Sequence, residues 1–179
     1  MGFEQGRFSG LCGAYAILNA LALLFPRRIS GEAGEDLFAA VLEAYPGPVR
    51  DLIVEGSERP EMIPMLDGAL AWTRDQGWPA WTWRDAHPAP GETGERFWDR
   101  MRAMLAVERT AVIVGFGDDE DRPRSRYEEH WTCVEEVGPR AVFLNDSSIY
   151  KRVPRRATGV RPEPGWAIED AFVLRRPMA

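Results

Sequence analysis

The most restrictive feature of this sequence is an apolar segment near its N-terminus. Residues 13–25 read GAYAILNALALLF, so a helix formed there carries apolar side chains on nearly every side. Such a helix is stable only where the rest of its own domain encloses it. The longest apolar run, from Leu11 to Phe25, is interrupted by Asn19, ends before Pro26, and falls short of the 18 residues that a membrane span needs. We therefore expect a buried helix rather than membrane insertion.

The remaining chain divides into a helical part and a strand-rich part. Apolar side chains recur at helical spacing in three further segments, which are residues 35–44, 60–76 and 95–107. Strand patterns follow at residues 110–116, 130–137, 141–144 and 167–174, with a hairpin turn at Gly138 and Pro139. A weaker strand is expected at 78–83, followed by a loop over 85–94. Helices followed by an antiparallel sheet indicate an α+β fold, and we expect residues 1–179 to form a single domain.

Composition excludes several classes of function. The chain has 22 basic and 28 acidic residues and a net charge of −6, which disfavours nucleic acid or an anionic membrane as a partner. Two cysteines and two histidines are too few for a closed zinc site, and they allow one disulfide at most. We expect no metal and no organic cofactor. The first ten residues lack a secretory pattern, which indicates a cytoplasmic protein, or one exported by a route without an N-terminal signal peptide.

Cys12 is the candidate nucleophile. It lies where the segment Gly10-Leu11-Cys12-Gly13 opens the apolar helix. At the start of a helix a thiolate faces unpaired backbone N–H groups and the positive end of the helix dipole, which stabilise it and favour nucleophilic attack at neutral pH. The alternative is that Cys12 is a small apolar side chain that fills a gap.

A thiol nucleophile needs a general base, and the chain offers two histidines. His87 lies in a loop and is followed by Pro88 and Pro90, so we expect its side chain to be solvated. His130 opens a strand, where the backbone is fixed while the imidazole can face a cleft. We therefore predict His130 as the base, although a lone histidine on a strand can also be structural.

Two polar residues after the hairpin can support that histidine. Asn145 and Asp146 follow the second arm of the hairpin that His130 begins, so an antiparallel pair returns them to its neighbourhood. A side-chain oxygen there can accept the Nδ1 proton of His130 and fix its tautomer. Because side chains alternate along a strand, Asn145 and Asp146 do not both point the same way. The alternative is a polar turn formed with Ser147 and Ser148.

The remaining reactive or charged residues have simpler interpretations. Cys133 is three residues from His130, hence on the opposite face of the strand, and is expected to be packed and structural. A disulfide between Cys12 and Cys133 is not expected in a chain without an export signal. Two charged segments, residues 118–126 and 151–156, are either solvated surfaces or a flap and a groove that contact substrate. Trp131 is expected to wall the cleft, whereas the core is expected to hold Trp72, Trp81 and Trp98.

The order of these patches resembles the papain-like cysteine peptidases. Gln5 comes first, Leu11-Cys12-Gly13-Ala14 opens a helix, His130-Trp131 begins a strand, and Asn145-Asp146-Ser147 follows a hairpin. The pattern is most similar to bacterial peptidases that process double-glycine leader peptides, and more distantly to Josephin-type deubiquitinases. It covers three short patches, whereas residues 26–109 resemble no family that we identify. The family has proline where this chain has Ser147, and its spacing from glutamine to cysteine is slightly shorter.

The resemblance implies a papain-like α+β fold, in which a buried catalytic helix packs on a C-terminal antiparallel sheet. It implies Cys12 as nucleophile, His130 as general base and then acid, and Asp146 as the residue that orients His130, with Asn145 as the alternative. Gln5 would donate its side-chain amide to the oxyanion, together with the backbone N–H of Cys12. The function implied is a cysteine hydrolase that cleaves a peptide, isopeptide or amide bond in a peptide or protein substrate through an acyl-enzyme.

Three other functions are compatible with the same residues. A glutamine deamidase or transglutaminase-like enzyme would use the same triad and release ammonia. An amidase toxin would arrest growth in a way that Cys12→Ala abolishes. A catalytically silent, peptidase-like binding module would retain its activity after that substitution.

Overall fold

The structure is a computed structural model that describes residues 9–29, 31–107, 109–117, 130–145, 152–155, 158–159 and 166–177. A short 3-10 helix, η1 (Ser9–Leu11), leads into the first α-helix. The helices are α1 (Cys12–Leu24), α2 (Gly31–Glu43), α3 (Val49–Glu55), α4 (Arg59–Asp75) and α5 (Gly94–Leu105). The strands are β1 (Thr82–Asp85), β2 (Thr110–Gly117), β3 (His130–Val137), β4 (Ala141–Asn145), β5 (Arg152–Pro154), β6 (Thr158–Gly159) and β7 (Trp166–Arg175). The α+β prediction is confirmed.

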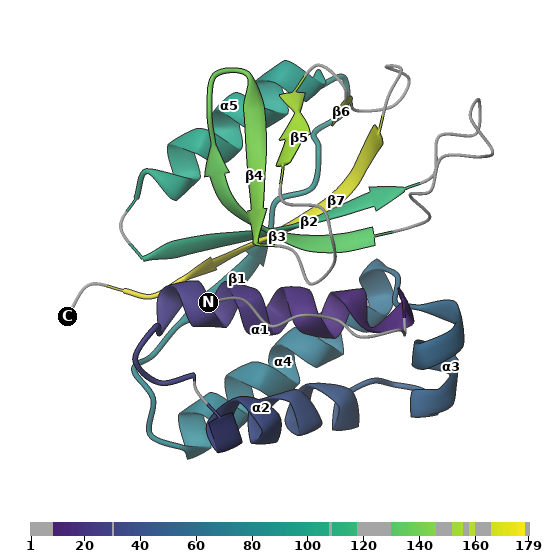
Figure 1. The fold of residues 1–179 in the computed structure, drawn as a ribbon, viewed down its shortest axis with the longest axis vertical. Coiled ribbons are helices and arrows are strands. Elements are labelled where there is room, and N and C mark those ends of the chain that lie inside the picture. Colours follow the sequence, from purple (N-terminus) through teal and green to yellow (C-terminus); the bar gives the residue numbers. More distant parts are fainter. Residues whose placement is uncertain are drawn as a thin grey trace.

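One sheet separates the helices into two layers. Within the described residues its strand order is β1-β7-β2-β3-β4-β5, all neighbours are antiparallel, and β6 pairs with β7 in parallel. Figure 1 shows α1 lying against the sheet, with α2 and α4 beyond it, while α5 lies on the opposite side. The predicted hairpin is confirmed, since β3 and β4 pair antiparallel with a bulge between Val134 and Glu136.

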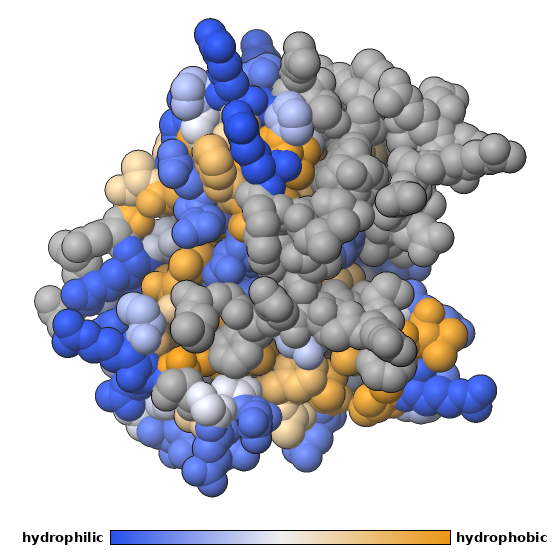
Figure 2. Space-filling model, viewed as in Figure 1, coloured by the Kyte–Doolittle hydropathy of each residue, from blue (hydrophilic) through white to orange (hydrophobic). Residues whose placement is uncertain are grey.

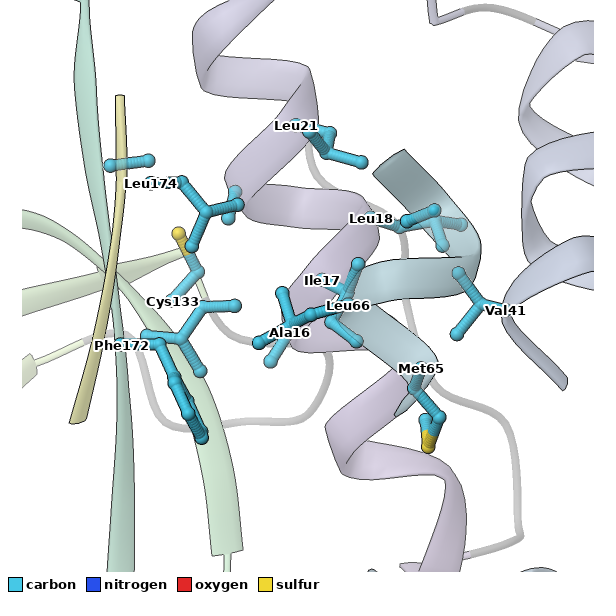
Figure 3. Packing of buried hydrophobic residues seen from close by; sticks show 14 of the residues in the cluster. Ala16, Ile17, Leu18, Leu21, Val41, Met65, Leu66, Cys133, Phe172 and Leu174 are labelled. Atoms are coloured by element: carbon cyan, nitrogen blue, oxygen red, sulfur yellow. The ribbon is translucent and has the colours of Figure 1, made fainter. Parts of the chain in front are cut away.

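The apolar helix is buried as its sequence predicts. Ten of the thirteen residues of α1 are buried, including Asn19. One face of α1 packs on the sheet at Cys133, Phe172 and Leu174, and the other faces apolar side chains from α2 and α4 (Figure 3). An all-round apolar helix is therefore stable here because protein covers it on both sides.

The opposite face of the sheet has its own core. Phe97, Trp98 and Met101 of α5 are fully buried there. They pack against strand residues that alternate with those facing α1, which include Val112, Val114, Val134, Val142 and Val173. The near-continuous apolar sequence of β2 is explained by this arrangement, because both of its faces are covered.

The element boundaries differ from prediction in the middle of the chain. The strand expected at 78–83 is wrong: the strand runs from Thr82 to Asp85, so the loop expected from residue 85 starts one residue later. Trp78 and Trp81 instead turn back onto α4, where the Trp78 N–H donates to the Thr73 carbonyl and the Trp81 indole donates to the Thr73 hydroxyl. The helix expected at 35–44 begins four residues earlier, at Gly31. The short elements α3, β5 and β6 were not predicted.

Candidate active site

Cys12 is the first residue of α1, and its side chain contacts the start of β3. The backbone N–H of Trp131 donates to Cys12 Sγ at 3.4 Å, and Cys12 is only 3% exposed. The residue before it, Leu11, caps the helix without a side-chain hydrogen bond. The thiol therefore lies at the positive end of the helix dipole and also receives a backbone hydrogen bond from the sheet.

Close packing explains the glycines on either side of the cysteine. A Cβ atom on Gly10 would lie 2.2 Å from the carbonyl oxygen of Leu52 in α3. A Cβ atom on Gly13 would lie 2.3 Å from Ser57 Oγ, in the loop that leads to α4. Both distances are too short for any side chain, so the entry to α1 is pressed against the segment from α3 to α4. This packing fixes where the thiol lies.

Trp131 connects that segment to the sheet. Its indole Nε1 donates to the carbonyl of Ser57 at 2.6 Å in a buried position. Its ring stacks on Phe172 with centroids 5.7 Å apart, and it covers Gly115 on the neighbouring strand, where a Cβ atom would lie 3.0 Å from the ring. A residue held by three different elements has one available position. Its backbone N–H is therefore aimed at the thiol by packing.

His130 begins β3 opposite Phe116 and is partly buried. Together with Trp131 it borders a pocket of 270 Å³ at the end of the sheet. The other lining residues come from the start of α4 and the facing ends of β2 and β7, and they are Ser57, Glu58, Arg59, Pro60, Gly115, Phe116, Glu169 and Asp170. Through the contact of Cys12 with Trp131, the structure brings the candidate nucleophile to the residue next to the candidate base.

The hairpin returns Asn145 toward this end of the sheet. Asn145 lies opposite Cys133, which is three residues along β3 from His130. Its carbonyl accepts a hydrogen bond of 3.1 Å from the side chain of Asn19, which is 1% exposed. The amide in the middle of α1 thus ties the helix to the end of β4. Asp146 and Gln5 lie outside the described residues, so their roles stay predictions.

Charged side chains that the sequence analysis did not select line the pocket. Arg59, the first residue of α4, makes ion pairs with Asp85 and, at 3.3 Å, with Asp170. Burial raises the pKa of Asp170, although Arg59 acts in the opposite direction. Burial also acts to raise the pKa of Asp85, but hydrogen bonds from Arg59 and His87 outweigh it and lower that pKa. The capping box of Glu58 and Glu61 marks where α4 begins, but no local pattern indicates that Arg59 reaches the sheet.

The second histidine and the second cysteine lie apart from this arrangement. His87 is half exposed, with its Nδ1 3.1 Å from Asp85 Oδ1. Cys133 is fully buried in the cluster beside α1, and both cysteines are free thiols. The packed face that holds Cys133 is therefore the face that α1 covers, and alternation along β3 starts the side chain of His130, three residues away, from the other face. Trp81 and Trp98 are buried as predicted, Trp72 is partly buried, and the segment 118–126 lies outside the described residues.

No group of three or more metal-ligating side chains occurs among the residues that the structure describes. Within the same residues, none of the helices has the length and apolar character needed to cross a membrane. No protein-family model matches this chain, and no curated protein matches its sequence.

Proposed function

We propose that this protein is a cysteine hydrolase with a papain-like fold, and that it acts on a peptide, isopeptide or amide bond. The observation that carries the proposal is the hydrogen bond from the Trp131 N–H to Cys12 Sγ. It joins the thiol at the start of a buried helix to the segment that contains His130. A cysteine with only a packing role needs neither a helix start nor a contact with the residue that follows a histidine.

The chemistry follows from the roles of the two side chains. His130 takes the thiol proton, and Cys12 Sγ attacks the substrate carbonyl carbon to form a tetrahedral oxyanion. The imidazolium then protonates the leaving amine, and the carbon–nitrogen bond breaks to leave a thioester. His130 next takes a proton from water, which attacks the thioester and releases the carboxylic acid and the free thiol. The backbone N–H of Cys12 and the Gln5 amide would stabilise the oxyanion.

One further contact and one pocket support this assignment. The Asn19 side chain binds the Asn145 carbonyl, so the helix that carries the thiol also fixes the strand end that precedes Asp146. Asp146 would then orient His130, with Asn145 as the alternative. The pocket that His130 and Trp131 border offers room for part of a substrate beside the residue whose N–H contacts the thiol.

A labelling experiment tests the proposal. We expect electrophile-tipped peptide or ubiquitin-like probes to form an adduct on Cys12 of the full chain, detected by mass spectrometry of its peptides. Cys133→Ala is the matched control, because it removes the other thiol and should leave labelling unchanged. His130→Ala should slow labelling strongly. Failure to label Cys12 with any probe, or equal labelling of Cys133, would contradict the proposed function.

A further inference from the structure

A second pocket lies at the other end of the sheet from Cys12. Its volume is 560 Å³, and it is lined by Glu95, Pro139, Arg140, Arg152, Pro154 and Arg155. These residues come from the start of α5, the turn after β3, and β5 with the residue that follows it. Since a strand rises about 3.3 Å per residue, β3 places this turn about 23 Å from His130. The pocket is therefore separate from the proposed active site.

Arg155 is the fixed part of this pocket. Although it is an arginine, it is only 5% exposed. Its Nη2 binds three oxygen atoms at 2.6 to 3.0 Å. They are the carboxylate of Asp99, the carboxylate of Glu95 and the backbone carbonyl of Glu95. The Nε of Arg155 is buried, and no hydrogen-bond partner for it occurs among the residues that the structure describes. A buried guanidinium with an unsatisfied N–H is costly, which is unusual for a residue that only supports the fold.

The backbone at Arg155 is held equally firmly. Its N–H donates to the Arg140 carbonyl at 3.1 Å, and its carbonyl accepts from the Thr158 hydroxyl at 2.8 Å. That hydroxyl in turn accepts a buried hydrogen bond of 2.6 Å from the Trp98 indole. A backbone hydrogen bond thus connects Arg140 and Arg155, and Thr158 connects Arg155 to the buried Trp98 of α5. Such a site is organised before any ligand arrives.

The other two arginines are available to a ligand. Arg140 and Arg152 are exposed, and no carboxylate among the described residues pairs with either. The guanidinium of Arg152 is held over the Phe143 ring, 5.6 Å from its centroid. Figure 2 shows strongly hydrophilic side chains at this upper end of the molecule, over the turn between β3 and β4. Local positive charge is retained there although the chain carries a net charge of −6.

We propose that this pocket binds the carboxylate side chains of an acidic peptide segment. The planar fork of arginine matches a carboxylate with two parallel hydrogen bonds, and Arg140 and Arg152 are free to make them. Glu95 at the edge of the pocket repels a doubly charged phosphate more than a single carboxylate. Pro139 and Pro154 add apolar walls against which the aliphatic part of a glutamate side chain can pack. This proposal does not rest on the proposed hydrolase function.

Fluorescence anisotropy with a capped, fluorophore-labelled hexaglutamate peptide tests it. We expect saturable binding that weakens as salt is added, and a loss of affinity of about tenfold or more in Arg140→Gln/Arg152→Gln. Arg27→Gln/Arg28→Gln is the matched control, because it makes the same change of charge at an exposed turn after α1. That control should bind within about twofold of wild type, and so should Cys12→Ala, which separates this site from the hydrolase. Far-UV circular dichroism checks that each variant is folded.

Three results would overturn the assignment. Hexaglutamate fails to bind saturably, or the two double variants lose affinity equally, which would indicate a general charge effect. Alternatively, inorganic phosphate displaces the labelled peptide at lower concentration than free glutamate does, which would make the site selective for phosphate.

Discussion

Replacing Trp131 by phenylalanine tests how the thiol is held in place. The substitution keeps an aromatic ring and the backbone N–H that contacts Cys12, but it removes the indole N–H that binds the Ser57 carbonyl at 2.6 Å. An unsatisfied buried carbonyl costs ~1–3 kcal/mol. The smaller ring adds ~1 kcal/mol for the space it leaves above Gly115 and against Phe172. We therefore expect the free energy of unfolding to fall by ~2–4 kcal/mol.

Two other tryptophans provide matched controls for this substitution. The Trp98 indole also makes a buried hydrogen bond of 2.6 Å, to Thr158, but on the opposite face of the sheet. Trp83 makes an exposed hydrogen bond of 2.9 Å to Asp67. Urea unfolding followed by circular dichroism should show comparable losses for Trp131→Phe and Trp98→Phe, and less than ~1 kcal/mol for the hydrogen bond lost in Trp83→Phe.

The alkylation rate of Cys12 distinguishes a change in the position of its thiol from a general loss of protein stability. Under conditions where all three variants are folded, the alkylation rate of Cys12 should change in Trp131→Phe and stay at the wild-type value in Trp98→Phe. If Trp131→Phe costs no more stability than Trp83→Phe, the buried hydrogen bond does not hold the tryptophan as described. If Trp98→Phe changes the alkylation rate of Cys12 as much as Trp131→Phe does, the effect comes from a general loss of stability, and Trp131 has no specific role in placing the thiol.

Three further outcomes are expected. A bidentate ion pair with Arg100 lowers the pKa of Glu92. The stabilisation that this ion pair gives the folded state is therefore present above the unfolded glutamate pKa of ~4.3, and it is lost as the pH falls through the lower, folded pKa. Glu92→Gln should therefore cost ~1–3 kcal/mol at neutral pH and much less near pH ~3, measured by urea unfolding at both; an equal cost at both would contradict this. Gly10→Ala should prevent stable folding, because the backbone oxygen of Leu52 occupies the position of the added Cβ atom. The thermal unfolding transition should then be lost, whereas a wild-type melting curve would show that this packing can relax. Asn19→Ala should cost ~1–3 kcal/mol and slow Cys12 alkylation, and unchanged values of both would remove its link to the site.

Periodicity predicted most of the fold, because most elements have a face that must be buried. The bounds of β3 agree with the sequence prediction at both ends, since His130 follows a charged segment and Gly138 ends the apolar alternation. The strand expected at 78–83 does not form because its tryptophans bind α4 instead of a neighbouring strand. Trp78 and Trp81 are apolar enough for a strand, but their N–H groups are used by Thr73 of α4, which is a tertiary contact that no local pattern reveals.

The sequence predicts a residue of the candidate site only where a reactive side chain lies at a recognisable helix or strand start. Cys12 and His130 were selected because a helix start and a strand start are visible in the sequence. Ser57 and Arg59 were missed because their roles depend on contacts with strands that come much later in the chain, at Trp131 and Asp170. The sequence indicates only that the glycines beside Cys12 open a helix, whereas the structure shows that the close approach of α3 requires Gly10.

If His130 activates the Cys12 thiol, removing the imidazole must change the pH dependence of alkylation at Cys12. The rate at which iodoacetamide modifies Cys12 is measured by mass spectrometry between pH ~5 and ~9 in wild type, His130→Ala and Cys133→Ala. We predict a reactive fraction at low pH in wild type and Cys133→Ala that is absent in His130→Ala. A single ordinary thiol titration near ~8.5 in all three proteins would show that His130 does not activate Cys12.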